Sequence, residues 1–254
     1  MNLYKKTAIE AALKSGHFIK SSLGKIKAVS YKGAKNIVTN VDKKAEEIII
    51  DRILSDFPGH SVLSEEMGAK DSGSAFKWLI DPLDGTSNFS RGFPFFAVSI
   101  GLEKKGRIIL GVVYDPVRDE LFFAEEGMGA YLNNKRITVS RTKRLSDAFL
   151  ATGFAYEKTK IRDNIKYFKS FLLSCFAVRR PGSAALDFSY VACGRLDGFW
   201  ELYLNPWDCA AGSLIVKEAG GRVTRFDGSG YSHYDKEVLA TNGLVHRQMM
   251  KIFS

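Results

Sequence analysis

The chain has 254 residues, of which 45% are hydrophobic and 26% charged. This composition can bury the core of one large domain or two packed halves, and it excludes a disordered tail. Lys and Arg number 37 and Asp and Glu 28, which gives a formal net charge of +9. The basic residues are scattered, which favours a solvated surface, and a basic nucleic-acid-binding protein is the alternative outside enzymes.

Three features of the chain bear on its location. Its longest apolar stretch, residues 93–102, contains Pro94 and is shorter than the roughly 20 residues that a bilayer crossing needs. Lysines interrupt the N-terminal apolar residues, which is not typical of a signal peptide. Cys175, Cys193 and Cys209 are odd in number and have no pairing motif. We therefore expect a cytoplasmic protein without a membrane partner.

The first half predicts two amphipathic helices followed by a sheet. Apolar residues recur at helical spacing in residues 3–23 and 41–57, with Thr39 as N-cap of the second helix. Strand-like segments follow at residues 61–64, 77–80, 95–102, 107–114 and 120–124, with a hairpin at 131–139. Residues 95–139 are therefore expected to form an antiparallel meander.

The second half alternates between the two kinds of element, which is typical of an α/β layer. We expect strands at 148–152, 177–180, 222–226 and 238–240, and helices at 164–173, 184–193, 208–219 and 244–253. We expect the boundary between the two halves of the chain near residues 142–147. The fold class is thus mixed α+β and α/β, with an N-terminal half at 1–145 and a C-terminal half at 146–254.

Residues 78–86 run an apolar strand into a turn that carries Asp81 and Asp84. Carboxylates at the end of a strand can share a hard cation, and Mg²⁺ prefers oxygen ligands. Gly85 and Thr86 add backbone N–H groups at the start of the next segment, where a phosphate can bind. The alternative is that Asp-Pro and Asp-Gly are ordinary turn dipeptides.

Further acidic residues weaken that alternative. Glu65 follows a strand-like segment, Asp208 opens a helix and Asp42 lies in the first turn of another. Carboxylates brought together repel one another unless a metal neutralises them. The four histidines are far apart and show no ligand spacing. Convergence of the carboxylates would therefore imply a cation held by oxygen ligands.

The chain resembles the inositol monophosphatase family of Mg²⁺-dependent, lithium-sensitive sugar phosphatases, over nearly its whole length. The resemblance rests on five segments in order, at residues 36–42 (NIVTNVD), 64–66 (SEE), 81–86 (DPLDGT), 182–185 (GSAA) and 207–212 (WDCAAG). It implies a five-layered αβαβα sandwich that forms a homodimer. The antiparallel sheet and most metal ligands would lie in residues 1–145, and the substrate-side residues and Asp208 in 146–254.

The resemblance also implies a metal site with two to three Mg²⁺ ions. Glu65, Asp81 and the Leu83 carbonyl would hold one ion. Asp81, Asp84 and Asp208 would hold a second, and Glu65 would assist a third.

The same resemblance assigns Thr86 and Asp42 as the pair that orients and deprotonates the attacking water, and it counts Glu65 with them as catalytic. The N–H groups of Gly85 and Thr86 would bind the phosphate. The implied reaction is direct in-line attack of water on a phosphate monoester, without a covalent intermediate.

Substrate-side residues follow from the same comparison. Glu201 matches the acceptor of an inositol hydroxyl, and Ser183 and Ala184 match the segment that donates to a ring hydroxyl. Asp84 and Asp208 would also face the substrate. The alternatives are that Glu201 is a surface charge and that residues 182–185 only begin a helix.

Three details of the motif residues are left open. Ser64 stands where the family often has Gly. A loop lysine near the third metal is Lys32 or Lys35. Arg179 and Arg180 are either a solvated pair or a contact to a second phosphate, as in members that hydrolyse fructose 1,6-bisphosphate.

The predicted substrate is a phosphorylated sugar or polyol of the inositol 1-phosphate type. Fructose 1,6-bisphosphate, or dual specificity, is the main alternative, followed by a nucleotide 3′-phosphate or NADP. Haloacid-dehalogenase phosphatases also place aspartates at a strand end, but two positions apart, whereas Asp81 and Asp84 are three apart.

Overall fold

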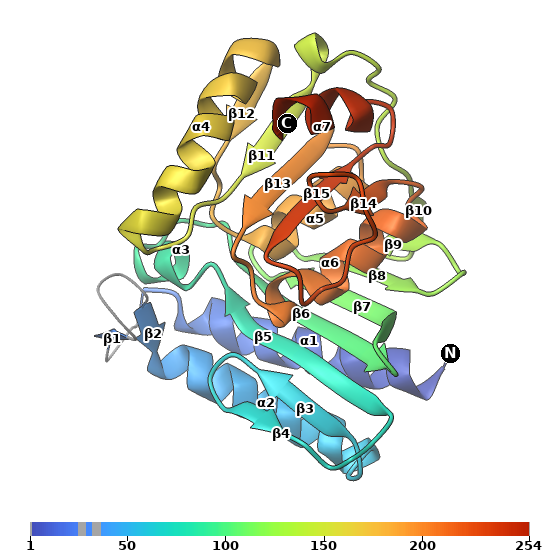
Figure 1. Cartoon of the computed structure of the whole chain (residues 1–254). Coiled ribbons are helices and arrows are strands. Elements are labelled where there is room, and N and C mark those ends of the chain that lie inside the picture. Colours follow the sequence, from blue (N-terminus) through green and yellow to red (C-terminus); the bar gives the residue numbers. More distant parts are fainter. Residues whose placement is uncertain (1, 25–28, 32–36, 254) are drawn as a thin grey trace.

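The computed structural model describes residues 2–24, 29–31 and 37–253 (Figure 1). Their helices are α1 (Leu3–Ser22), α2 (Asn40–Asp56), α3 (Thr86–Ser90), α4 (Lys158–Ser174), α5 (Ala184–Ala192), α6 (Pro206–Glu218) and α7 (His246–Phe253), with one 3₁₀ turn at Leu145–Asp147.

The strands of the described residues form two large sheets and one small hairpin. The hairpin pairs β1 (Val29–Tyr31) with β2 (Ile37–Thr39). The larger sheet has the order β10-β9-β8-β7-β6-β5-β3-β4. Its strands are β3 (Ser61–Ser64), β4 (Gly68–Lys70), β5 (Phe76–Asp84), β6 (Ala97–Lys104), β7 (Arg107–Asp115), β8 (Glu120–Glu125), β9 (Ala130–Leu132) and β10 (Lys135–Ile137).

The second sheet has five strands in the order β12-β11-β13-β15-β14. They are β11 (Phe149–Thr152), β12 (Ala177–Arg179), β13 (Gly198–Leu202), β14 (Arg222–Thr224) and β15 (Glu237–Thr241). β11 pairs in parallel with both β12 and β13, whereas β15 is antiparallel to its neighbours. This sheet is therefore mixed.

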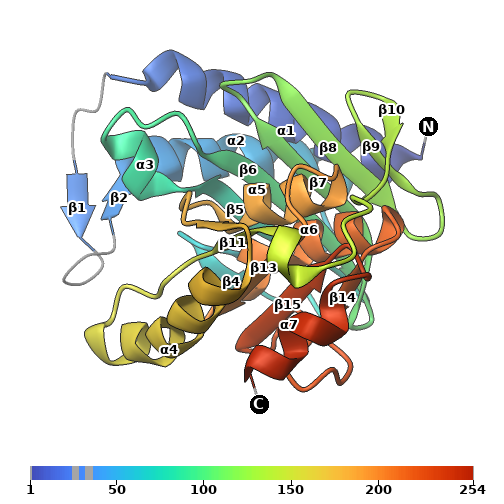
Figure 2. The ribbon, with the colours of Figure 1, turned by 90° about the horizontal axis from the view of Figure 1, so that it is seen from above.

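Helices and sheets alternate in five layers. α1 and α2 contact one face of the eight-stranded sheet, α5 and α6 lie between the two sheets, and α4 and α7 contact strands of the second sheet. Seen from above, α1 and α2 lie on one side of the molecule and α4 and α7 on the opposite side (Figure 2). The predicted αβαβα sandwich is confirmed.

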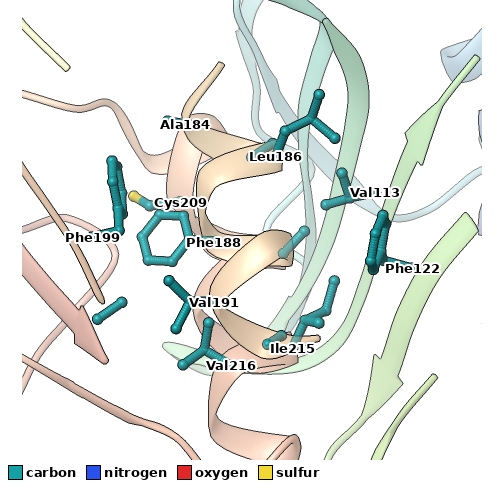
Figure 3. Close-up of a cluster of buried hydrophobic side chains, with 14 of the residues drawn as sticks. Val113, Phe122, Ala184, Leu186, Phe188, Val191, Phe199, Cys209, Ile215 and Val216 are labelled. Atoms are coloured by element: carbon teal, nitrogen blue, oxygen red, sulfur yellow. The ribbon is translucent and has the colours of Figure 1, made fainter. Parts of the chain in front are cut away.

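The middle helical layer packs against both large sheets in one buried hydrophobic cluster. Phe188 of α5 packs edge-on against Phe199 of β13, with 4.9 Å between the ring centroids. Leu186 lies on the side of α5 that faces Val113 and Phe122 of the eight-stranded sheet (Figure 3). The helix is apolar on both sides because each side meets a sheet.

The structure agrees with the predicted helices and with the meander, and differs in three places. The strand expected at 77–80 is β5, which continues to Asp84 with a register shift between Asp81 and Asp84. β13 was not predicted, because a short buried run such as GFWEL has no alternating pattern. The short elements β1, β2, β4 and α3 were also missed.

Strand order places the acidic segments side by side. β3 and β5 are parallel neighbours, with Ser64 opposite Ile80. The residues that follow these two, Glu65 and Asp81, therefore lie at the same end of the sheet. The order of the strands, and not closeness in the chain, brings these two carboxyl groups together.

Gly111 of β7 lets α6 approach the eight-stranded sheet closely. A Cβ at this position would lie 2.6 Å from the Ala211 carbonyl oxygen and 2.9 Å from its Cα. We expect Gly111→Ala to lower the free energy of unfolding by about 1–3 kcal/mol, because the overlap is with backbone atoms. Urea unfolding measures the change.

Gly59→Ala is the matched control, since a Cβ at Gly59 meets no atom within 4 Å. We expect its free energy of unfolding to stay within about 0.5 kcal/mol of the parent protein. Equal stability of the two variants would contradict the close approach of α6 to β7.

Candidate active site

A pocket of about 550 Å³ opens between the two halves of the chain. Residues from β5, α3, α5, β13 and α6 line its wall. The wall includes these residues predicted from the sequence: Glu65, Asp81, Leu83, Asp84, Gly85, Thr86, Ser183, Ala184, Glu201 and Asp208. Asp42 is buried and reaches the pocket through its hydrogen bond with Thr86.

β5 carries two of the carboxylates. Asp81 is 2% exposed, and its Oδ1 accepts a hydrogen bond of 2.9 Å from the Leu83 N–H. This bond spans Pro82, and the ladder to β6 resumes only at Asp84. The expected turn is thus an irregularity within the strand, and it directs both Asp81 and Asp84 into the pocket wall.

Asp84 bridges β5 and α5. Its Oδ2 accepts hydrogen bonds of 2.7 Å from the Ser183 hydroxyl and from the Ala185 N–H. A carboxylate is stabilised at a helix N-terminus by unpaired N–H groups. Burial nevertheless raises the pKa of Asp84 to about 6, because these bonds offset only part of the cost of desolvation.

Asp208 lies in the first turn of α6, where its Oδ2 accepts a hydrogen bond of 2.7 Å from the Asn205 N–H. Burial raises the pKa of Asp208 well above its ordinary value, and the carboxylate of Asp84 raises it further. Burial also raises the pKa of Asp81, with added repulsion from Glu65 and Asp84. The pocket therefore brings together acidic side chains from both halves of the chain.

Asp42 and Thr86 form a hydrogen-bonded pair at the edge of this cluster. Asp42 closes a capping box at the start of α2, where its Oδ2 accepts a hydrogen bond of 2.8 Å from the Thr39 N–H. The Thr86 hydroxyl lies 2.8 Å from Asp42 Oδ1 and 3.0 Å from the Leu83 carbonyl oxygen, to either of which it can donate. Burial outweighs these bonds and raises the pKa of Asp42.

Gly85 sets the direction in which the chain enters α3. Its φ is +94°, and a Cβ here would lie 2.9 Å from the Phe95 carbonyl oxygen. Both the left-handed conformation and the lack of space favour glycine. Gly85 thus turns the chain so that Asp84 and Thr86, on either side of it, both line the pocket.

The donor set fits a hard cation. Within the described residues, no three His, Cys, Asp or Glu side chains are arranged as a ready ligand cage. Mg²⁺ does not require one, because it uses one or two carboxylates together with waters and substrate phosphate oxygens. Carboxylates that raise one another's pKa are relieved by a divalent cation, so the residues present suit Mg²⁺.

Glu201 lies on β13 and is 9% exposed, which excludes its interpretation as a surface charge. A Cβ on Gly153 would overlap its carboxylate, so that residue must be glycine for Glu201 to keep this position. Burial and the carboxylate of Asp208 raise the pKa of Glu201 well above its ordinary value. The role of Gly153 had no signal in the sequence.

Arg179 and Arg180, whose roles the sequence left open, lie in different surroundings in the structure. Arg180 lines the pocket, whereas the Arg179 guanidinium lies 4.8 Å from the centroid of the Phe149 ring. Lys32 and Lys35 lie outside the described residues. Pocket residues that sequence reasoning missed include Gly153, Tyr156, Lys158, Lys160, Asp187 and Asn205. Of these, only Asp187 carries a signal, as the one charge in the apolar segment of α5.

The chain belongs to the inositol monophosphatase family, whose sequence model matches residues 2–254. The members of this family are phosphatases that generally depend on Mg²⁺. The alternative of a haloacid-dehalogenase phosphatase is therefore not supported. Among the described residues, no helix is both long and apolar enough to cross a membrane.

Particular relatives carry two kinds of name. The chain is 46% identical to the inositol-1-monophosphatase of Synechocystis over 95% of this chain and 85% of that protein. It is also 46% identical to Nus factor SuhB of Vibrio cholerae, over 87% of this chain and 84% of that protein. The crystal structure of suhB from Bartonella henselae matches with a TM-score of 0.95 and 39% identity. The match covers 100% of this chain and 99% of that chain.

Two structures of SaIMPase-II are similar to this chain and contain ligands. One is bound to inositol monophosphate, with a TM-score of 0.82 and 29% identity. The other is bound to 2′-AMP, with a TM-score of 0.83 and 28% identity. Each covers 99% of this chain and 93% of its own.

We expect Mg²⁺ to raise the Tm of the protein by on the order of 5 °C at saturation, since it binds only the folded carboxylate cluster. Asp81→Asn should raise the Tm in EDTA, because one repelling charge is removed, and should lose most of the shift caused by Mg²⁺. Thermal unfolding with Mg²⁺ and with EDTA measures both effects.

Glu47→Gln serves as control, because Glu47 is an exposed residue of α2 that pairs with Lys44. It should keep the full shift. A Mg²⁺ shift in Asp81→Asn as large as in the parent protein would contradict a metal site at Asp81.

Proposed function

We propose that this protein is a Mg²⁺-dependent phosphate monoester hydrolase of the inositol 1-monophosphatase type. The observation that carries the proposal is the cluster of buried carboxylates from both halves, placed beside the Asp42–Thr86 pair in one pocket. Membership of the family supports the same reaction class.

In this proposal Glu65, Asp81 and the Leu83 carbonyl hold one ion, and Asp81, Asp84 and Asp208 hold another; Glu65 assists a third. When bound, Mg²⁺ lowers the pKa of the attacking water and neutralises the phosphoryl oxygens. Asp84 keeps α5 in register with these residues through Ser183 and Ala185.

Thr86 and Asp42 position the nucleophile. When the Thr86 hydroxyl donates to Asp42, its lone pairs are left to accept a proton from a water in the pocket. Asp42 is the final proton acceptor, and its raised pKa makes it a stronger base than an exposed carboxylate. The Gly85 and Thr86 N–H groups bind the phosphoryl oxygens. Water attacks in line, the P–O bond to the leaving group breaks, and the leaving oxygen takes up a proton from solvent water, so that a free alcohol and inorganic phosphate leave.

The leaving group is proposed to be a polyol. Glu201 accepts a hydrogen bond from a ring hydroxyl, and Ser183 and Ala184, at the start of α5, line the same pocket. The inositol monophosphate bound to SaIMPase-II supports this class of substrate. The 2′-AMP bound to the same relative keeps nucleotide monophosphates among the substrates to be compared.

Fructose 1,6-bisphosphate is the second candidate, and Arg180 is the observation that favours it. This side chain lines the pocket together with Lys158 and Lys160. Cations at the rim suit a second phosphate. Arg179 has no part in this role, because it stacks on Phe149.

The homodimer and the cytoplasmic location stay predictions. The exposed apolar side chains of Leu172, Leu173 and Phe176, at the end of α4, support a contact with a second copy. We do not propose nucleic acid as a partner, because the basic residues are scattered along the chain and form no long run that would follow a phosphate backbone.

Asp84→Asn should reduce turnover by at least 100-fold while leaving the protein folded, because it removes a metal-binding charge and weakens the contact with α5. Phosphate release from inositol 1-phosphate and fructose 1,6-bisphosphate, with Mg²⁺ and with EDTA, tests the proposed function. Circular dichroism checks the fold.

Asp227→Asn is the matched control, since Asp227 lies in an exposed turn and not in the pocket wall. The Asp227→Asn variant should release phosphate at the same rate as the parent protein. Near-normal turnover in folded Asp84→Asn, or hydrolysis that persists in EDTA, would count against the proposal. Comparable turnover of both substrates would indicate dual specificity.

Glu201→Gln should change the preference among substrates more than the hydrolysis itself, because Glu201 contacts the leaving group and not the phosphate. We expect the ratio of kcat/KM for inositol 1-phosphate to that for fructose 1,6-bisphosphate to shift by about tenfold. Equal losses on every substrate would rule out this role.

A further inference from the structure

Asp187 lies in the first turn of α5 and is 1% exposed. Its Oδ1 is buried and has no hydrogen-bond partner among the described residues. Two other buried carboxylates near the pocket do accept hydrogen bonds. Asp84 accepts bonds from Ser183 and Ala185, and Asp42 accepts bonds from Thr39 and Thr86.

A buried carboxyl oxygen without a donor is unfavourable for the folded protein. Replacing it by an apolar residue of similar size would remove this cost. Groups of this kind are kept where a ligand completes their hydrogen bonds, at some expense of stability. The position of Asp187 in the pocket should therefore indicate which atom of a bound ligand donates a hydrogen bond to its Oδ1.

Asp187 lines the same pocket as Glu201. It follows Ser183 by four residues, so it lies on the same side of α5 as the residues that begin the helix. Its carboxyl interacts electrostatically with those of Glu201 and Asp84. Two acidic side chains, Asp187 from α5 and Glu201 from β13, thus face the same part of the pocket.

Arg180 is the cation that interacts with both carboxyl groups, and its positive charge partly offsets the raised pKa of Asp187 and of Glu201. Arg180 is exposed, and a flexible exposed side chain does not complete a buried acceptor. A substrate hydroxyl is a small neutral donor that can enter the pocket with the leaving group. It satisfies the carboxyl without adding charge.

We propose that Asp187 is a specificity-determining residue that binds a hydroxyl group of the polyol leaving group, next to the hydroxyl bound by Glu201. This inference rests on the proposed phosphatase function. A pair of acceptors selects substrates that present two hydroxyls and disfavours those that lack them, because a buried acceptor would then stay unpaired.

The test compares inositol 1-phosphate with p-nitrophenyl phosphate, which has no hydroxyl on its leaving group. In Asp187→Ala we expect kcat/KM for inositol 1-phosphate to fall about 10- to 100-fold, mainly through KM. The value for p-nitrophenyl phosphate should change less than about twofold. Asp187→Asn keeps an acceptor oxygen and should retain more of the activity on inositol 1-phosphate.

The Tm gives an independent readout. Asp187→Asn should unfold at the same temperature as the parent protein or higher, since the unpaired buried carboxylate is removed. A purely structural role would lower the Tm and would reduce activity on both substrates equally, and either result would overturn the proposal. Unchanged kcat/KM for inositol 1-phosphate in Asp187→Ala would also overturn it.

Arg180→Ala tests whether Arg180, and not a substrate hydroxyl, is the partner of Asp187. If Asp187 served only to hold Arg180, this variant would reproduce the loss seen in Asp187→Ala, and the proposal would be wrong. Failure of the proposed function has a different signature. The parent protein would then release no phosphate from inositol 1-phosphate with Mg²⁺, and both inferences would fall together.

Discussion

The contact between Asp84 and the start of α5 holds the two halves of the pocket in register. One carboxylate oxygen accepts from both Ser183 and Ala185, so the strand that carries the acidic motif is joined directly to a helix that lines the pocket. Asp208 and Glu201 enter the same pocket from the C-terminal half. The chemistry proposed here depends on this contact, since neither half alone contains every acidic residue.

That arrangement opposes stability. Burial raises the pKa of Asp81, Asp84 and Asp208, and repulsion from neighbouring carboxylates raises the pKa of Asp81 and Asp208 further, which means that the folded protein holds these groups in an unfavourable state. The surrounding layers compensate through apolar packing, as in the contact of α5 with both sheets (Figure 3). Functional groups are thus supported by a core that they do not themselves stabilise.

Much of the fold followed from local pattern, because long amphipathic helices and hairpins leave periodic signals. α1, α2 and the meander from β6 to β10 are examples. β13 left no such signal, since it is short and buried at the centre of its sheet. The irregularity of β5 was also invisible, because Asp-Pro in a sequence indicates a turn and only pairing with β6 extends the strand to Asp84.

The amino-acid sequence by itself determined the chemistry available: acidic residues of the right kind and order, in motifs that resemble one family. Only the tertiary structure decided which of them meet and in what surroundings. It buries Glu201 against Gly153, separates Arg180 from Arg179, and leaves Asp187 in the pocket wall without a donor for its Oδ1 among the described residues. Burial and pairing depend on contacts between segments far apart in the chain, and no local pattern encodes these.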